Sequence, residues 1–393
     1  MNDQTKIKVG VLFGGRSAEH EISLVSARNV IAGLDPAKYE VVPIGIDRDG
    51  SWLTAREASE LLVDSPDPAR SLPVLNVSSG QALSLAPGAS AGALKTGGDA
   101  QSSGSPGLQV DVIFPVLHGT YGEDGSVQGL LKLLGIPYVG PDPLGSTVGM
   151  DKDVMKRLLR DADIPNARFR VYLRQAALSA FGAFETDDAN AAQVSETARE
   201  IVAELGLPLY VKPANMGSSV GITRVKSVED LASAVHEALK YDNKILIEEN
   251  IVGREIECAV LGSQEEPAAS IPGEIIPKDG FYSYEAKYLD EKGAALEIPA
   301  RLNAATVKRV QEISIRTYQA LCLEGMSRVD MFVLESGEIY INEVNTIPGF
   351  TGISMYPKLW EHSGLSFDKL LDRLIELALD RHRLQGALQT SVE

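Results

Sequence analysis

The sequence predicts an α/β protein of two or three domains, and three observations lead to this prediction. The chain has 393 residues, 44% of them hydrophobic, which is enough to build more than one core. Near the N-terminus, a short apolar run is followed by a glycine-rich turn and then by apolar residues at helical spacing. Later, β-branched and aromatic residues alternate around a Ser-Gly dipeptide, which is typical of a β-hairpin. Strands alternating with helices favour the α/β class.

The first strand is predicted over residues 7–13, and the first helix begins near Ile22. The turn between them reads GGRSAEHE. Backbone N–H groups at the N-terminus of a helix favour an anion such as a carboxylate or a phosphate. The glycines do not match the spaced GxGxxG fingerprint, so we do not expect NAD. Glu19 in this turn is either a ligand contact or an ordinary first-turn acid favoured by the helix dipole.

The N-terminal region continues with a predicted strand over residues 41–46 and a helix after Trp52. From Ser78 to Gly107 the composition shifts to Gly, Ser, Ala and Pro, so we expect a mobile surface insertion without its own core. The strand VDVIFPVL then leads into the loop HGTYGEDG. Open α/β sheets bind ligands at the carboxyl ends of their strands. His118 in this loop is therefore a candidate ligand contact, and a hydrogen-bonded loop residue is the alternative.

A second domain is predicted to begin near Pro141. Its first helix carries Lys152 near the start, and a later strand ends at Lys212. The loop after that strand, PANMGSSVG, is flexible enough to close over phosphates. It is not a Walker A loop, which needs GxxxxGK[ST] before a helix, and a long hairpin is the alternative. Two further strands flank an acidic break, where Glu248 and its backbone neighbours could accept from an adenine amino group and Glu255 could reach a ribose hydroxyl.

Residues 277–302 are polar and aromatic with little periodicity, and we interpret them as a candidate lid over the site. Lys287 and Tyr288 are its chemically useful members. Helices are predicted over residues 303–321 and, as an amphipathic closing helix, over residues 367–384.

The predicted hairpin carries the most informative side chains. If the dipeptide at 336–337 is a two-residue turn, the register of the two strands is fixed. Counting residues outward from this turn along both strands places two acids, Asp330 and Glu343, opposite each other. It also pairs Arg328 with Asn345, and all four side chains then share one face.

Two carboxylates about 5 Å apart repel each other unless a positive charge lies between them. A divalent cation would supply it, because Mg²⁺ takes one or two carboxylates and fills its other positions with phosphate and water oxygens. Arg328 would suit a phosphate or a developing oxyanion. The alternative is a surface hairpin in which Arg328 neutralises the acids. Nearer the turn, the same face is predicted to carry Phe332, Leu334, Ile339 and Ile341.

Charge and cysteine content exclude several classes of protein. The counts of 54 acidic and 37 basic residues give a net charge of −17, which argues against a general nucleic-acid or anionic-membrane binder. Two cysteines indicate neither a disulfide framework nor a metal–thiolate site. The N-terminus is polar, and no apolar run reaches the ~18 residues of a membrane span. We therefore expect a soluble, cytoplasmic protein.

Taken together, the motifs resemble one family. They are GGRSAEHEIS, LHGTYGEDGSVQGLLKLLGIPYVG, MDK, VKPANMGSSVG, LIEE, YEAKY, RVDMFV and NEVNTIPGFT. In this order they resemble the D-alanine–D-alanine ligases of the ATP-grasp superfamily over nearly the whole chain. The resemblance implies a Rossmann-like N-terminal α/β domain to residue 140, a central ATP-grasp domain over 141–251, and a C-terminal ATP-grasp domain over 252–393. ATP would lie between the last two domains, and the family favours a homodimer.

The resemblance also implies roles for individual residues. The implied ATP contacts are Lys152, Lys212, Ser218, Ser219, Glu248, Glu249, Ile251, Glu255 and Lys287. The implied ligands for two Mg²⁺ or Mn²⁺ ions are Asp330, Glu343 and Asn345. The implied catalytic residues are Glu19, Ser218, Tyr288, Arg328 and Gly349. The implied substrate contacts are His118, Ser354 and Met355. The chain departs from the family at Asn250, where the family often has an aromatic residue. The resemblance therefore does not say which side chain contacts adenine at this position.

The implied reaction joins two D-alanines for peptidoglycan precursor synthesis. The first D-alanine is phosphorylated on its carboxylate by ATP, and the amine of the second then displaces phosphate. In the family, Tyr at the position of Tyr288 goes with D-alanine as second substrate, whereas Phe goes with D-lactate. One alternative is a D-alanine–D-lactate ligase, or a ligase for another carboxylate and amine, of the same superfamily. Another is a non-catalytic ATP-binding regulatory module.

Overall fold

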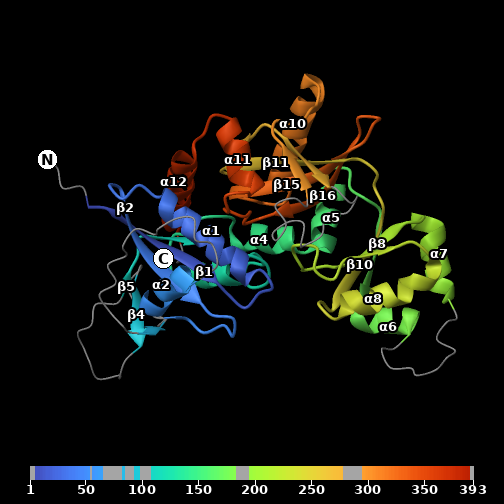
Figure 1. The fold of residues 1–393 in the computed structure, drawn as a ribbon, viewed down its shortest axis with the longest axis horizontal. Coiled ribbons are helices and arrows are strands. Elements are labelled where there is room, and N and C mark those ends of the chain that lie inside the picture. The colour runs from blue at the N-terminus through green and yellow to red at the C-terminus, as the bar shows by residue number, and fades with distance from the viewer. Residues whose placement is uncertain are drawn as a thin grey trace.

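The computed structural model has three sheet-based parts arranged in an elongated molecule (Figure 1). It describes residues 5–53, 55–64, 82–84, 93–97, 108–182, 194–277 and 294–389. No helix within these ranges is both long and apolar enough to cross a membrane.

The N-terminal part contains a three-stranded parallel sheet in the order β2-β1-β6. Its strands are β1 (Ile7–Gly14), β2 (Tyr39–Ile46) and β6 (Val112–Pro115), and its helices are α1 (His20–Gly33), α2 (Ala55–Asp64) and α3 (Ser126–Leu133). β1 is buried from Val9 to Gly14. Such a strand, covered on both faces, is expected to read as a continuous apolar run. This strand–turn–helix opening confirms the predicted α/β start.

The predicted insertion lies mostly outside the described residues. Two short strands within it are described, β3 (Ala82–Ser84) and β4 (Ala93–Gly97), and they form a small antiparallel sheet with β5 (Leu108–Gln109). Eight residues of the insertion thus form strands, and the prediction that it lacks its own core stays a prediction.

The central part is a four-stranded antiparallel sheet in the order β7-β10-β8-β9, covered by three helices. The strands are β7 (Phe169–Leu173), β8 (Leu209–Pro213), β9 (Thr223–Val225) and β10 (Lys244–Glu249). The helices are α6 (Arg174–Phe181), α7 (Glu196–Leu205) and α8 (Leu231–Leu239), with the 3₁₀ turn η1 (Val228–Asp230) before α8. Ser195 caps α7 by accepting from the backbone N–H of Ala198 at 3.1 Å.

The C-terminal part is a sheet in the order β14-β13-β11-β15-β16, with β12 paired to β11. Its strands are β11 (Arg254–Gly262), β12 (Pro267–Ala269), β13 (Gly273–Pro277), β14 (Ala294–Glu297), β15 (Gly325–Val333) and β16 (Ile339–Asn345). The middle of the predicted lid, residues 278–293, lies outside the described residues. Its ends are anchored, because Pro277 in β13 lies opposite Ala294 in β14.

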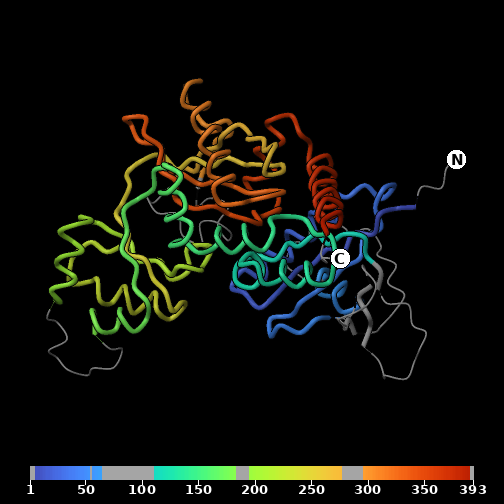
Figure 2. Tube along the Cα trace, turned by 180° about the vertical axis from the view of Figure 1, so that it is seen from behind, coloured from blue at the N-terminus to red at the C-terminus, as the bar shows by residue number. Residues whose placement is uncertain are grey.

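Helices join the parts into one body. α4 (Pro143–Met150), α5 (Lys152–Asp161) and α10 (Ala304–Ala320) lie against the C-terminal sheet, and Met155 and Leu159 of α5 share its core. α11 (Met355–His362) and the amphipathic α12 (Phe367–Gly386) belong to a core that also contains β1 and β6 of the N-terminal part. Figure 2 shows α12 beside the N-terminal part from behind. The domain boundaries at 140 and 251 stay a prediction.

The turn of the β15–β16 hairpin has three residues, not two. The backbone N–H of Gly337 donates to Leu334 O, and the N–H of Leu334 donates to Glu338 O, both at 2.9 Å. Gly337 has φ +85°, the left-handed conformation that such a loop requires at this position. The predicted two-residue turn is therefore wrong by one residue.

A β-bulge restores the predicted register at the far end. Met331 lies opposite Ile341 and Asp330 opposite Glu343, so Asn342 is an extra residue in β16. Beyond the bulge the two pairs are as predicted, Asp330 with Glu343 and the arginine–asparagine pair after it.

The same bulge overturns the predicted apolar face. Ile339 and Ile341 lie opposite Val333 and Met331, and all four belong to the core on the other side of the sheet. Only Phe332 and Leu334 of the predicted apolar set stay on the face of the acids.

Candidate active site

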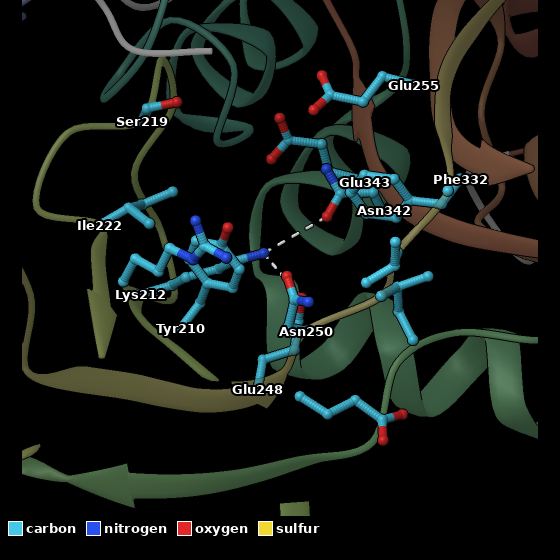
Figure 3. Close-up of a pocket in the computed structure, with 15 residues that line it drawn as sticks. Tyr210, Lys212, Ser219, Ile222, Glu248, Asn250, Glu255, Phe332, Asn342 and Glu343 are labelled. Atoms are coloured by element: carbon cyan, nitrogen blue, oxygen red, sulfur yellow. Dashed lines mark hydrogen bonds and ion pairs between the residues drawn. The ribbon is translucent and has the colours of Figure 1, made fainter. Parts of the chain in front are cut away.

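A pocket of 280 Å³ lies where the central sheet faces the C-terminal sheet. Figure 3 shows Tyr210, Lys212 and Glu248 on one side of it, with Glu255, Phe332, Asn342 and Glu343 on the other. Predicted ATP contacts that line this pocket are Lys212, Ser219, Glu248, Glu249, Ile251 and Glu255. The structure therefore brings six of the predicted ATP contacts, from Lys212 to Glu255, to one cavity that Phe332, Asn342 and Glu343 also line.

Lys212 is held at the floor of this pocket by two acceptors. Its Nζ lies 2.8 Å from Glu248 Oε1 and 3.4 Å from Asn342 Oδ1. Burial works against its positive charge, but the charge of Glu248 outweighs burial and raises the pKa of Lys212. Lys212 therefore stays protonated in the pocket.

Glu249 is turned toward Arg168 of the segment before β7. Its two carboxylate oxygens accept from the backbone N–H and the Nε of Arg168, each at 2.7 Å. A role for Glu249 in nucleotide binding would thus come from its backbone, since its carboxylate is already bound.

Lys152 links three elements beside the pocket. Its Nζ donates to Met216 O at 2.7 Å and lies 3.4 Å from Glu343 Oε2. Met216 belongs to the predicted phosphate-covering loop, whereas Glu343 belongs to β16. Lys152 is thus placed between that loop and the hairpin acids.

Acids lie side by side on three strands of the C-terminal sheet. Glu257 of β11 lies opposite Asp330, which lies opposite Glu343. Arg328 forms a two-pronged contact with Asp330, both bonds at 2.7 Å, and its Nε lies 3.0 Å from Glu257 Oε2. The amide of Asn345 donates to Asp330 at 2.9 Å. Here Arg328 neutralises two of the acids, as the alternative interpretation expects.

The donor set still fits a divalent cation. Asp330, Glu343 and Asn345 offer carboxylate and amide oxygens on one face of two adjacent strands. Within the described ranges, no group of three or more His, Cys, Asp or Glu is arranged to hold a metal by itself. Mg²⁺ needs few protein ligands when phosphate oxygens and water complete its shell, so the set is sufficient for metal bound together with a nucleotide.

Glu19 is where loops from two parts of the chain meet. It is 6% exposed, and the Ser218 hydroxyl donates to its carboxylate. A Cβ at Gly119 would lie 2.6 Å from Glu19 Oε2, and one at Gly217 would lie 3.0 Å from it. Glycine at these two positions lets both loops close onto the carboxylate. Glu19 and Ser218, two of the implied catalytic residues, are therefore in direct contact.

His118 is buried between two hydrogen-bond partners. Its Nδ1 lies 3.1 Å from Ile347 O, which can only accept, so Nδ1 carries the proton. Its Nε2 lies 3.0 Å from Ser26 Oγ. Burial lowers the pKa of His118 to about 4, partly opposed by the bond to Ile347. The ring is therefore neutral at pH 7, and both of its nitrogens are bound within the protein, as expected of a hydrogen-bonded loop residue.

The buried neutral state of His118 predicts a loss of stability in weak acid. The folded-state pKa lies below the ordinary 6.5, so the unfolded chain binds the proton more tightly. As the pH falls below 6.5, proton binding therefore stabilises the unfolded chain relative to the folded one. From pH 7 to pH 5 we expect His118 to contribute a loss of about 2 kcal/mol in the free energy of unfolding. Urea unfolding of the wild type and of His118→Asn at both pH values measures it. An equal pH dependence in the two proteins would contradict the assignment.

Gly349, Ser354 and Met355 lie together at the start of α11. A Cβ at Gly349 would lie 2.8 Å from Ser354 Oγ, and that oxygen also accepts from the N–H of Thr351 at 2.9 Å. Met355 is 4% exposed as a whole residue and belongs to the core, so its side chain is not a contact for a ligand. The free N–H groups of a helix N-terminus favour a carboxylate. Lys287 and Tyr288 lie outside the described residues.

The structure adds site residues that sequence reasoning missed. Asn342 reaches the pocket only because of the bulge, which no local pattern signalled. Glu123 of the loop HGTYGEDG is a second such residue. Its carboxylate accepts from the N–H groups of Gly119 at 2.7 Å and Ile347 at 3.2 Å, so it joins the N-terminal loop to the segment after β16. Burial and the nearby charge of Glu19 raise the pKa of Glu123 to about 8.

Comparison with known proteins gives matches over nearly the whole chain. Residues 8–141 match the family model "D-ala D-ala ligase N-terminus" and residues 173–376 match "D-ala D-ala ligase C-terminus". A D-alanine–D-alanine ligase A of Chromobacterium violaceum is 49% identical, covering 99% of each chain. One from Escherichia coli K12 is 46% identical, covering 98% of this chain and all of that one.

Solved structures give the same result. A D-alanine–D-alanine ligase of Coxiella burnetii superposes with a TM-score of 0.78 at 37% identity, covering 98% of this chain and 97% of the other. The VanG D-Ala:D-Ser ligase of Enterococcus faecalis gives 0.77 at 36% identity, covering 95% of this chain and all of the other.

Proposed function

We propose that this chain, which belongs to the D-alanine–D-alanine ligase family, joins two D-alanines to D-alanyl-D-alanine at the expense of ATP. The products are the dipeptide, ADP and phosphate, and the dipeptide serves cell-wall peptidoglycan synthesis. The observation that carries the proposal is the pocket between the central and C-terminal sheets, where Lys212 and Glu248 face Glu343. Full-length similarity to ligases of this name supports the substrate.

The proposed reaction has two steps. A carboxylate oxygen of the first D-alanine attacks the γ-phosphorus of ATP, and ADP leaves. The amine nitrogen of the second D-alanine then attacks the acyl carbon, phosphate leaves with the electron pair of the broken C–O bond, and the amine loses a proton. Because an acylphosphate hydrolyses readily, the enzyme must hold its charged reactants together and exclude water.

We assign residue roles by their surroundings. Glu19 would hold the ammonium of the first D-alanine, and Ser218 would tie the phosphate-covering loop to it. Arg328 and the Gly349 N–H would stabilise the oxyanion. The N-terminus of α11, at Ser354 and Met355, would hold the carboxylate of the second D-alanine.

The phosphates of ATP would meet local positive charge in a chain of net charge −17. Lys152 and Lys212 are in position to contact them, and Lys287 is proposed to join them from the lid. Asp330, Glu343 and Asn345 would hold two Mg²⁺ or Mn²⁺ ions, which when bound neutralise phosphate charge. We further propose a homodimer that works in the cytoplasm, where ATP is available.

The direct test is ADP release from Mg²⁺-ATP with D-alanine, L-alanine, or D-alanine together with D-lactate or D-serine, with products identified by mass. We expect turnover with D-alanine alone to give the dipeptide. Turnover only with a mixed pair would assign the alternative ligase reaction, for which the D-serine ligase among the structural relatives is a precedent. ATP binding without turnover would favour the regulatory module.

Tyr288 is proposed to favour an amine as the second substrate. With Tyr288→Phe we expect the ratio of D-alanyl-D-lactate to D-alanyl-D-alanine to rise by at least about tenfold, which corresponds to about 1.4 kcal/mol between the two transition states. Competition of D-lactate with D-alanine at fixed pH, read by mass, measures the ratio. An unchanged ratio would remove Tyr288 from the specificity argument.

A further inference from the structure

Lys156 is a buried lysine that the proposed mechanism does not use. It lies one helical turn after Lys152 on α5, and its side chain is 1% exposed. Its Nζ lies 2.9 Å from Glu248 Oε2 and 5.8 Å from the centre of the Phe169 ring. In the described part of the chain, no other acceptor meets this ammonium group. Burying an ammonium is strongly unfavourable unless it is paired, so the position of Lys156 depends on Glu248.

Glu248 lies between two lysines from different elements. Lys156 of α5 approaches Oε2, while Lys212 of β8 donates to Oε1 at 2.8 Å. Lys212 lines the pocket and Lys156 does not. Figure 3 shows the amino group of Lys212 directed at Glu248 and Asn342. The carboxylate thus has one lysine on its pocket side and another behind it.

The charges of this trio do not cancel. Burial alone would keep Glu248 neutral, but the charges of Lys156 and Lys212 hold the pKa of Glu248 down to about 2. Burial lowers the pKa of Lys156, and the charge of Glu248 opposes that effect. One carboxylate and two ammonium groups leave a net charge of +1. A Lys212–Glu248 pair by itself would be neutral and would attract a polyphosphate only weakly.

We propose that Lys156 is a positioning residue for the nucleotide, which neutralises Glu248 from behind so that Lys212 presents its full positive charge to the phosphates. This inference rests on the proposed ATP site. It gives Lys156 a measurable signature, because loss of its charge weakens binding in proportion to the charge on the nucleotide. A purely structural lysine would affect triphosphates and monophosphates alike.

The test compares Lys156→Met with the double variant Lys156→Met/Glu248→Gln, which removes one charge of each sign and restores the net charge of +1. Arg160→Met is the matched control, because Arg160 is exposed on the same helix and carries the same charge. The ligands are AMP and a non-hydrolysable ATP analogue, each with Mg²⁺ and without D-alanine. Calorimetry gives the dissociation constants, and thermal unfolding gives Tm.

For Lys156→Met we expect the triphosphate analogue to bind at least tenfold more weakly and AMP less than threefold more weakly. The double variant should return the ratio of triphosphate to AMP affinity to near the wild-type ratio, in which any loss of an adenine contact at Glu248 cancels. Arg160→Met should bind both nucleotides as the wild type does. Equal losses for both nucleotides, or a double variant no better than Lys156→Met, would overturn the proposal.

If Lys156→Met does not fold, the test compares the double variant Lys156→Met/Glu248→Gln with the wild type. A ratio of triphosphate to AMP affinity within threefold of the wild-type ratio then supports the proposal, and a ratio tenfold lower overturns it. Because no D-alanine is present, a failure of ligation leaves this measurement intact. A wild-type protein that binds the analogue but makes no dipeptide would reject the proposed function and not the role of Lys156.

Discussion

Replacement of Glu343 by glutamine is expected to lower kcat for dipeptide formation by at least about 10³-fold, which corresponds to about 4 kcal/mol of transition-state stabilisation. Glu343 lies opposite Asp330 and 3.4 Å from the Nζ of Lys152. The neutral amide is a poorer ligand for Mg²⁺ than a carboxylate. It also leaves Lys152 without its charged partner on the hairpin. Steady-state ADP release at saturating substrates measures the effect.

The stability of Glu343→Gln should change little. The substitution removes one negative charge from the row of acids across β11, β15 and β16. The weaker repulsion between these acids offsets the lost contact with Lys152. Glu335→Gln is the matched control, because Glu335 is exposed in the turn of the same hairpin. We also expect Glu343→Gln to need more Mg²⁺ for half-maximal activity. Activity within tenfold of wild type, with an unchanged Mg²⁺ requirement, would reject Glu343 as a metal ligand.

The hairpin illustrates how far local sequence rules reach. The alternating pattern predicted both strands, and it also predicted that Asp330 lies opposite Glu343. The turn was predicted one residue too short, and the bulge at Asn342 was not predicted at all. These two errors cancel beyond the bulge, so the acids are paired as predicted. Between the bulge and the turn they do not cancel, so the prediction puts Ile339 and Ile341 of β16 on the wrong face. Bulges are set by packing on both faces of a sheet, which a single strand pattern does not report.

Other residues depend on contacts between distant segments. Lys156 fits the pattern of an exposed helical lysine, and only the approach of β10 to α5 shows that it is buried against Glu248. The same holds for Glu123, whose carboxylate joins segments more than 200 residues apart. Helix α11 was not predicted; it has only eight residues and contains Pro357, which is tolerated in the first turn of a helix.

Arg328 gives the second large effect, and two substitutions separate its roles. Its guanidinium contacts Asp330 with two bonds of 2.7 Å and Glu257 with one of 3.0 Å. Arg328→Lys keeps the charge but loses the planar fork that serves both acids. We expect kcat to fall by about 10²-fold to 10³-fold, as when one oxyanion donor is removed, with the KM for ATP within threefold of wild type.

Arg328→Met should also unfold more easily. It leaves Asp330 and Glu257 buried, 9% and 7% exposed, without their shared cation, and breaking a buried ion pair costs about 3–5 kcal/mol. Urea unfolding should therefore rank the wild type above Arg328→Lys and both above Arg328→Met. Adding Mg²⁺ with a non-hydrolysable ATP analogue should recover part of the loss, because a metal bound at Asp330 would replace the missing positive charge. If ligand and metal stabilise Arg328→Met no more than the wild type, Asp330 does not share its charge between the arginine and a metal.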